Sequence, residues 1–220
     1  VAVTPRRPAD ASSTEIERPP YLLALLATAV VLAGYVLTLA PTVTFWDAGE
    51  LVAAVRTLGI PHPPGTPLFV MIAHAWAIVF PFGEYAVRTN LLSALLSAAG
   101  AGFFFLVAHE GLRGWTVLPA TRMAGAAAGA LIGAFGFTAW QNSNETEVYA
   151  VATFTIAAMA WLAGRWRTRR GTPGARRSLL LIVYLAGLSV GNHLLALLAG
   201  PAIVACLAVT LRTSPGADSG

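Results

Sequence analysis

One stretch of the chain, Thr42–Pro67, holds residue types that can move a proton. Asp47 and Glu50 lie three residues apart, and His62 follows within a proline-rich run. A carboxylate beside an apolar wall has a pKa raised by desolvation and can take a proton from a hydroxyl group. The same spacing also fits a capping box, in which Asp47 caps a helix and Glu50 reaches back to the N–H of the cap. The two interpretations are compatible, because capping holds a side chain still.

The run from His62 to Gly65 is expected to be extended and stiff, since proline fixes its own φ and restrains the residue before it. Such a run could be a simple rigid connector. A connector does not need a histidine, however, and a fixed backbone also suits a loop that walls a ligand site. His62 is therefore a candidate substrate-binding residue.

Further polar residues lie at the ends of apolar segments. Glu147 and Tyr149 stand at the start of one segment, Asn192 and His193 separate two others, and Arg88 opens a fourth. All five are candidates for binding a substrate.

Each of these groups also has a structural interpretation. Asn144 and Glu147 are spaced as a capping box, and Asn144-Glu145-Thr146 is a weak match to a glycosylation sequon. The residues from Gly191 to His193 fit a tight turn. Arg88 could extend its side chain along the membrane interface or bind a lipid phosphate.

The composition excludes an ordinary soluble domain. Of 220 residues, 56% are hydrophobic and only 11% are charged, whereas soluble domains carry about 25% charged residues. Several uncharged runs approach the roughly 20 residues needed to cross a hydrocarbon core. We therefore predict an all-α polytopic membrane protein. Every basic residue is an arginine, and the net charge of +4 relates to membrane orientation rather than to nucleic acid.

The sequence contains no metal-binding signature, P-loop or nucleotide fingerprint. A metal site is therefore not predicted, and no cofactor is certain. The single Cys206 lies in an apolar run, so it does not reveal the redox compartment.

The elements that must position the polar residues are six expected transmembrane helices and two shorter helices in the first outer loop. The spacing of Leu51, Val55 and Leu58 predicts an amphipathic helix over 47–58, and an apolar helix is expected over 67–82. The transmembrane helices are expected over 21–40, 88–108, 123–140, 148–164, 178–190 and 194–211. Residues 1–20 are expected to form a flexible cytoplasmic tail, 21–212 the transmembrane domain, and 213–220 a polar tail at which a longer protein could be truncated.

The distribution of arginine indicates whether the segment 67–82 crosses the membrane. If it does not cross and the N-terminus is inside, 12 arginines lie on the inner side and 2, Arg56 and Arg88, on the outer side. If it crosses, the distribution becomes 4 inside and 10 outside. The positive-inside rule favours the helix that does not cross. The acidic and histidine residues of three separate loops then meet on the outer face, where they could line one wet cavity.

Two stripes of small residues recur every four positions in the expected spans, which is typical of closely packed helix pairs. The first is Ala94, Ala98 and Gly102, and the second is Gly125, Gly129 and Gly133.

The strings LAPTVTFWDAGE and GIPHPPGTPL closely resemble a family of polytopic membrane proteins. This family is found in bacteria, often as a domain of unknown function. Its animal members include the endoplasmic-reticulum protein O-mannosyltransferase that acts on plexin-type receptors. The family is similar to the GT-C glycosyltransferases. Arg88, the run Glu147–Ala150 and the run Gly191–His193 extend the resemblance, which covers about residues 30–200.

The resemblance implies a GT-C-like fold and a glycosyltransferase that uses a polyprenyl-phosphate sugar as its donor. It implies that Asp47 is the general base on the acceptor hydroxyl in an inverting transfer, and that Glu50 orients the acceptor or assists Asp47. His62, Arg88, Glu147, Tyr149, Asn192 and His193 would line the donor and acceptor pocket. The partners would be the lipid-linked sugar, an acceptor protein or glycan, and the lipid bilayer, with no nucleic acid. Dependence on a divalent metal is left open.

Three functions compete on this basis. The first is a membrane glycosyltransferase that moves a mannose-like sugar, located in the bacterial cytoplasmic membrane with its active site on the outer face. The second is a non-catalytic lipid-phosphate-binding or scaffold protein, such as a truncated relative. The third, a proton-coupled transporter, is disfavoured because the middle of each expected span lacks ionisable residues.

Overall fold

The computed structural model describes residues 18–116 and 118–212, which form helices joined by short connections. The predicted tail 213–220 and most of the predicted tail 1–20 lie outside the described residues. The α-helices are α1 Tyr21–Leu37, α2 Ala48–Thr57, α3 Pro67–Val79, α4 Tyr85–Gly111, α5 Pro119–Phe135, α6 Phe137–Ser143, α7 Val148–Thr168, α8 Pro173–Val190 and α9 Ala199–Arg212. Two 3₁₀ helices, η1 Leu112–Gly114 and η2 Leu194–Leu198, precede α5 and α9. The described residues contain no β-strand, as the all-α prediction requires.

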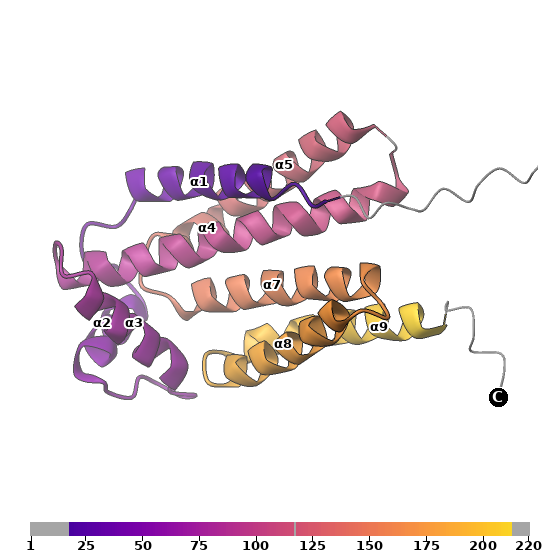
Figure 1. The fold of residues 1–220 in the computed structure, drawn as a ribbon. Coiled ribbons are helices and arrows are strands. Elements are labelled where there is room, and N and C mark those ends of the chain that lie inside the picture. Colours follow the sequence, from indigo (N-terminus) through magenta and orange to yellow (C-terminus); the bar gives the residue numbers. More distant parts are fainter. Residues whose placement is uncertain (1–17, 117, 213–220) are drawn as a thin grey trace, which may run out of the picture.

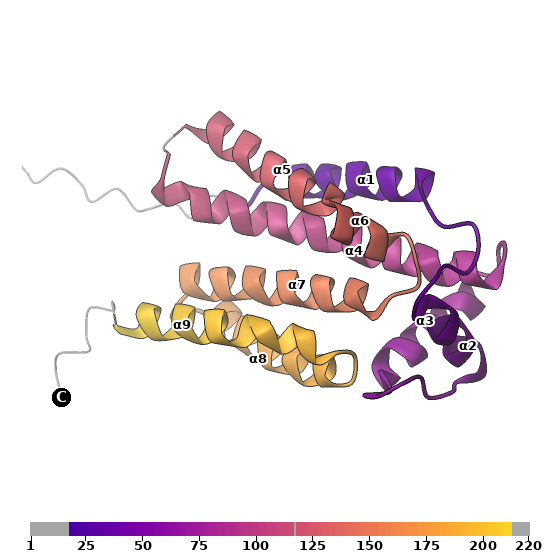
Figure 2. The ribbon, with the colours of Figure 1, turned by 180° about the vertical axis from the view of Figure 1, so that it is seen from behind.

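The long helices lie side by side, with α4 and α7 at the centre of the bundle. Helix α4 packs against α1 and α5 on one side and against α7 on the other. Helices α8 and α9 pack against the far side of α7 (Figures 1 and 2). Alanine and glycine allow these close approaches, because buried Ala94, Ala98 and Ala101 put no bulk between α4 and its neighbours.

Within the described residues, three helical segments are long and apolar enough to cross a membrane, namely Tyr85–Gly114, Val148–Thr168 and Leu194–Arg212. These segments indicate an integral membrane protein. The pair α5 and α6 would be a fourth span if the bent pair counts as one. Helix α1 has 17 residues, and α8 begins with a turn that contains Arg176 and Arg177. Six spans therefore stay a prediction.

The structure corrects the expected span over residues 123–140. Two helices occupy this region, α5 and α6, and they meet at an angle of 66°. Gly136 lies between them with an extended ψ of 139°, which interrupts the helical hydrogen bonds. The bend turns the last residues of α6 toward the end of the bundle where α2 and α3 lie (Figure 2).

Helices α2 and α3 lie together at one end of the bundle and cross the direction of the long helices (Figure 1). Their cores contact α4 and α7 through buried Leu51, Val55, Phe69 and Ala73. With 13 residues and a rise of about 1.5 Å per residue, α3 is about 20 Å long. This length is shorter than a hydrocarbon core of about 30 Å and agrees with the predicted helix that does not cross.

The connection between α2 and α3 is not the extended run that its prolines predicted. It forms a turn in which the Gly65 N–H donates to the His62 carbonyl oxygen at 2.9 Å. Gly65 has a φ of +84°, a backbone conformation that residues with a Cβ atom rarely adopt. The turn carries His62 back over the start of α2, which brings the histidine to Glu50.

The two stripes of small residues serve different purposes. A Cβ atom added at Gly102 would overlap Thr28 Oγ1 and lie 3.1 Å from the Ala24 carbonyl oxygen, so this glycine lets α4 touch α1. A Cβ atom at Gly129 or Gly133 would meet nothing within 4 Å. These two glycines line a cavity instead. The prediction of close helix packing is therefore correct for Gly102 but wrong for Gly129 and Gly133.

Replacing Gly102 by alanine should destabilise the bundle, because the Ala24 backbone cannot move away without shifting α1. We expect Gly102→Ala to be about 1–3 kcal/mol less stable than Gly129→Ala. Both changes give the same gain in helix propensity, so the difference reports packing alone. Thermal unfolding of the two variants in detergent micelles measures it, and equal stability would contradict the close α1–α4 contact.

Candidate functional site

Asp47, Glu50 and His62 form a cluster of charged groups at the start of α2. Glu50 Oε2 lies 2.8 Å from His62 Nδ1, and Glu50 Oε1 accepts a hydrogen bond of 2.7 Å from the His62 backbone N–H. His62 Nε2 lies 3.9 Å from Asp47 Oδ2 on the other side of the ring. The imidazole therefore stands between the two carboxylates.

The capping box expected for Asp47 and Glu50 does not form. Asp47 makes no side-chain cap to α2, and the Glu50 carboxylate is taken by His62 rather than by the cap's N–H. The Asp47 carboxylate accepts no hydrogen bond from the described residues, and 57% of its side chain is exposed. Of the two carboxylates, Asp47 is thus the one open to an incoming group.

The hydrogen bond between Glu50 and His62 changes the pKa of both groups. It raises the pKa of His62 and lowers the pKa of Glu50. Since the pKa of His62 is raised, the stabilisation is complete below its ordinary value of 6.5 and is lost as the pH rises through the folded value. Since the pKa of Glu50 is lowered, the stabilisation is also lost as the pH falls below 4.5. Between these limits the pair is a charged imidazolium and a carboxylate.

The same three residues are a donor set that a divalent cation could use. One ligand atom from each of Asp47, Glu50 and His62 lies within 4.8 Å of the other two. Carboxylate and imidazole donors suit several divalent cations. Binding would require a neutral His62, and the hydrogen bond that the imidazole donates to the Glu50 carboxylate opposes this by stabilising the protonated ring.

A network of buried polar side chains fixes the loops around this cluster to α4. The Asn90 amide donates to the carbonyl oxygens of Ala40 and Thr42 at 3.0 and 3.2 Å, which holds the loop before α2. Its Oδ1 accepts a 2.6 Å hydrogen bond from Thr146, in the loop before α7. Thr146 also lies 2.6 Å from Thr89 Oγ1. The loops before α2 and α7 are thus tied to one turn of one helix.

Sequence reasoning missed this network. The sequence does contain a pattern that indicates it, however, because Thr89, Asn90 and Ser93 place three polar side chains in the first turns of an otherwise apolar helix. All three are buried, and buried polar groups are hydrogen-bonded almost without exception. A polar cluster at the start of an apolar helix therefore predicts partners in the adjoining loops.

Glu145 and Glu147 are buried carboxylates that face the cluster, and each is 6% exposed. Glu145 Oε2 accepts a 2.5 Å hydrogen bond from Thr44, which ties the loop before α2 to the loop before α7. Desolvation, together with the smaller effect of the charges of Glu145 and Asp47, raises the pKa of Glu147 to about 7. Glu147 therefore holds its proton close to neutral pH and is the carboxylate beside an apolar wall that the sequence led us to expect at Asp47.

The capping box predicted for Asn144 and Glu147 is also absent. Asn144 ends α6 and donates from its amide to the Trp140 carbonyl oxygen, while Glu147 precedes α7 without a side-chain cap. Asn144 is 6% exposed, so it is too buried to serve as a glycosylation acceptor.

The turn between α8 and η2 joins the same end of the bundle. The Asn192 amide donates to the Val148 carbonyl oxygen at 3.1 Å, and the Leu68 N–H donates to the Gly191 carbonyl oxygen at 2.7 Å. The tight turn predicted here is confirmed, and it fastens α3 and α7 together. The rings of Tyr149 and His193 meet edge to face, with centroids 5.3 Å apart. His193 Nδ1 accepts from the Leu195 N–H, which fixes the ring.

Arg88 does not join the cluster. Its guanidinium donates to the carbonyl oxygens of Gly83 and Ala77 and lies over the Tyr85 ring, 5.9 Å from its centroid. These contacts brace the corner between α3 and α4. Among the sequence-predicted site residues, Asp47, Glu50, His62 and Glu147 share charge interactions, whereas Tyr149, Asn192 and His193 lie at the neighbouring helix ends.

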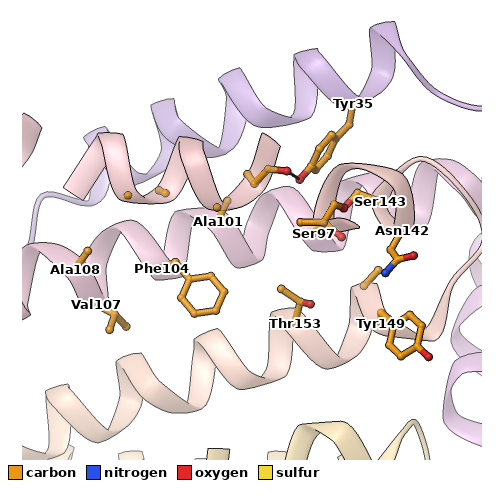
Figure 3. A pocket seen from close by; sticks show the side chains of 16 residues that line it. Tyr35, Ser97, Ala101, Phe104, Val107, Ala108, Asn142, Ser143, Tyr149 and Thr153 are labelled. Carbon is orange, nitrogen blue, oxygen red and sulfur yellow. Dashed lines mark hydrogen bonds between the residues drawn. The ribbon is translucent and has the colours of Figure 1, made fainter. Parts of the chain in front are cut away.

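A cavity of about 520 Å³ runs between α4, α5, α6 and α7. Figure 3 shows Tyr149 and Asn142 toward one end and Val107 and Ala108 toward the other, with Phe104 and Thr153 between them. Gly129 and Gly133 form part of its wall, where the absence of side chains leaves the space open. The cavity therefore joins the polar end of the bundle to its apolar middle.

Comparison with known proteins gives a consistent result. Residues 47–215 match the family described as the protein O-mannosyl-transferase TMEM260 N-terminal domain. The chain is 32% identical over 169 residues to protein O-mannosyl-transferase TMEM260 of Mus musculus, which covers 75% of this chain and 22% of that protein. It is 25% identical over 142 residues to the protein of the same name in Dictyostelium discoideum, which covers 61% of this chain and 16% of that protein. The chain thus spans less than a quarter of the length of these relatives, and no solved structure matches it.

The burial of Glu147 predicts a stability that falls with rising pH. Its folded pKa of about 7 exceeds the ordinary value of 4.5. Below pH 4.5 the carboxyl is protonated in both the folded and the unfolded state and does not affect stability. As the pH rises from 4.5 to about 7, the unfolded state ionises first and the folded state loses stability. The loss amounts to about 3 kcal/mol. Glu147→Gln should remove it, so this variant should exceed the native protein in melting temperature at pH 8 and not at pH 4.5.

Thermal unfolding in detergent at the two pH values measures this difference. Glu84→Gln is the matched control, because Glu84 is exposed and its replacement should leave the pH dependence unchanged. If the melting temperature depended on pH in the same way in the native protein and in Glu147→Gln, then ionisation of Glu147 would not destabilise the folded state.

Proposed function

Since the chain belongs to the TMEM260 N-terminal domain family, we propose that it forms the membrane-embedded, acid-bearing part of a glycosyltransferase. The reaction is the transfer of a mannose-like sugar from a polyprenyl-phosphate carrier to an acceptor hydroxyl, with inversion at the anomeric carbon. The acceptor is a protein or a glycan. The observation that carries this proposal is the convergence of Asp47, Glu50, His62 and Glu147 from separate loops at one end of a helical bundle.

Asp47 is the general base in this proposal. It takes the proton of the acceptor hydroxyl while that oxygen bonds to the anomeric carbon and the bond from this carbon to the carrier phosphate breaks. The exposure of Asp47 and its lack of a hydrogen bond leave its oxygens available. Glu50 cannot take this role while both of its oxygens are held by His62, so it positions the histidine and, through it, the neighbouring Asp47.

His62 and Glu147 stabilise the carrier phosphate in different ways. A protonated His62 offers positive charge to the departing phosphate at a site that otherwise carries carboxylates. Glu147, with a pKa of about 7, can donate a hydrogen bond at neutral pH rather than repel an anion. Tyr149, Asn192 and His193 line the adjoining wall, and Arg88 supports it by bracing the α3–α4 corner.

The cavity between α4, α5, α6 and α7 suits the isoprenoid part of the donor. Alanine is the commonest residue in its wall, which also includes Phe104 and Val107, and its end at Tyr149 lies beside the start of α7. An isoprenoid chain in this position would leave its phosphate at the polar end of the bundle. The cavity's volume of about 520 Å³ lies within the range of sites that enclose small organic ligands.

The membrane arrangement follows from the same proposal. The chain would have six spans and a GT-C-like fold, with the N-terminus in the cytoplasm and the charged cluster on the outer face of a bacterial inner membrane. Arg165, Arg167, Arg169 and Arg170 lie at the end of α7 that is opposite the cluster, as the positive-inside rule requires.

Replacing Asp47 by asparagine tests the assignment of the base. The change keeps the shape and removes the proton acceptor, so transfer of radiolabelled mannose from a polyprenyl-phosphate donor in membranes should fall by about 10²–10⁴-fold. Glu84→Gln, an exposed carboxylate of the same outer face, should retain full transfer. Unchanged transfer by Asp47→Asn at equal expression would eliminate Asp47 as the base. Donor binding without any transfer, whether or not Asp47 is present, would favour the non-catalytic lipid-phosphate-binding alternative.

Filling the cavity tests the position of the donor chain. Gly133→Leu places a large side chain in the open space beside Ala130 and Ala134, so transfer from a long-chain donor should fall at least tenfold. Transfer from a donor with a short prenyl chain should change little, because its chain ends before the obstruction. Equal losses with both donors would place the isoprenoid elsewhere.

A further inference from the structure

A second hollow lies beside the charged cluster, between the loop that precedes α2 and the end of α6. Its volume is about 270 Å³. The residues that line it are Thr38, Ala40, Thr44, Phe45, Trp46, Trp140, Gln141, Asn144 and Glu145. We refer to it as the tryptophan cleft. Trp46 directly precedes Asp47 in the chain, so the cleft adjoins the proposed base.

Aromatic rings form the wall of the tryptophan cleft, and two of them are almost fully exposed. Phe45 is 87% and Trp46 is 86% exposed, although burial of such side chains is strongly favourable. Trp46 also has a φ of +64°, a conformation that costs a bulky residue about 1–3 kcal/mol. The backbone thus holds an indole ring away from the protein core at an energetic cost. Across the cleft, Trp140 is fixed because its Nε1 donates to Thr38 Oγ1 at 3.0 Å.

Polar groups with unused hydrogen-bonding capacity lie beside these rings. Glu145 is 6% exposed and uses Oε2 to accept from Thr44, while Oε1 has no hydrogen bond to the described residues. The side-chain amide of Gln141 likewise makes no hydrogen bond within the described part of the chain. An intramolecular hydrogen bond contributes about 0.5–1.5 kcal/mol, so a ligand that donates one to Glu145 Oε1 would be stabilised there.

The charge and size of the cleft limit the ligand. A buried carboxylate repels an anion, which excludes a phosphate group. The volume is just below the range of about 300–1,000 Å³ that holds drug-sized molecules, and the wall combines aromatic rings with the polar side chains of Thr44, Gln141 and Glu145. A neutral ring with an apolar face and several hydroxyl groups meets these conditions. A pyranose sugar is such a molecule, since its C–H face stacks on an indole and its hydroxyls both donate and accept.

We propose that the tryptophan cleft binds one pyranose ring, with Trp46 stacked on its C–H face and with Glu145 and Gln141 hydrogen-bonded to its hydroxyls. This inference rests on the proposed function, because it places a sugar beside Asp47. Two sugars could supply this ring, because both have the same chemistry: the sugar of the lipid-linked donor and a sugar already attached to the acceptor.

Binding of methyl α-D-mannopyranoside to the whole chain in lipid nanodiscs tests the cleft without any turnover. Saturation-transfer NMR should detect the sugar, and Trp46→Ala should reduce its signal at least fivefold. Trp115→Ala is the matched control, because Trp115 is 88% exposed and lies in the connection between α4 and α5 at the far end of the bundle (Figure 1). Gln141→Ala, which removes a side chain that makes no hydrogen bond to the described residues, should also weaken binding. Equal signals in Trp46→Ala, Gln141→Ala and Trp115→Ala would overturn the proposal and leave Trp46 as an interfacial anchor.

The same variants separate this inference from the proposed function. Sugar binding that needs Trp46 and survives Asp47→Asn would support the cleft even if no transfer were detected. Transfer that needs Asp47 while Trp46→Ala has native sugar binding and a native KM would support the enzyme and refute the cleft. In the transfer assay, a raised KM of Trp46→Ala for the lipid-linked donor identifies the donor sugar as the ligand, and a raised KM for the acceptor identifies the acceptor sugar.

Discussion

The hydrogen bonds of Asn90 are the constraint on which the end of the bundle that carries α2 and α3 depends. A single buried amide on α4 satisfies the carbonyl oxygens of Ala40 and Thr42, and its oxygen accepts from Thr146. A backbone polar group left unpaired near a membrane has few alternative partners, so each of these bonds is hard to replace. The loops that carry Asp47 and Glu147 are therefore both anchored to α4, and they are also joined directly by the hydrogen bond from Thr44 to Glu145.

Burial disfavours the charged form of a carboxylate, and the four acidic residues at this end of the bundle differ in burial. Asp47 and Glu50 lie at the surface, where His62 compensates their charge. Glu145 and Glu147 lie beneath, where Thr44 supplies one hydrogen bond and desolvation raises the pKa of Glu147. Carboxylates with different environments can serve different roles in one reaction, one as a base and another as a hydrogen-bond donor. This division gives the cluster more chemical range than four equivalent acids would have.

The bend at Gly136 connects the two hollows of the molecule. It ends α5 at Phe135 and turns α6 toward the end of the bundle where α2 and α3 lie. There, Trp140 and Gln141 line the tryptophan cleft, and Asn142 and Ser143 line the larger cavity (Figure 3). One interrupted helix thus contributes to the walls of both hollows.

The sequence by itself determined the helical membrane character, the presence of two short helices after the first apolar segment, and the chemical interest of Asp47, Glu50 and His62. These features are local, because hydropathy, helical periodicity and proline positions depend on residues that are near one another in the chain. Only the tertiary structure decided which partner each charge has. Glu50 binds His62 instead of capping its own helix, and Glu145 meets Thr44 from 101 residues away. Burial of Glu147, exposure of Trp46 and the bend at Gly136 were likewise beyond the sequence, since each depends on how separate helices pack around a shared space.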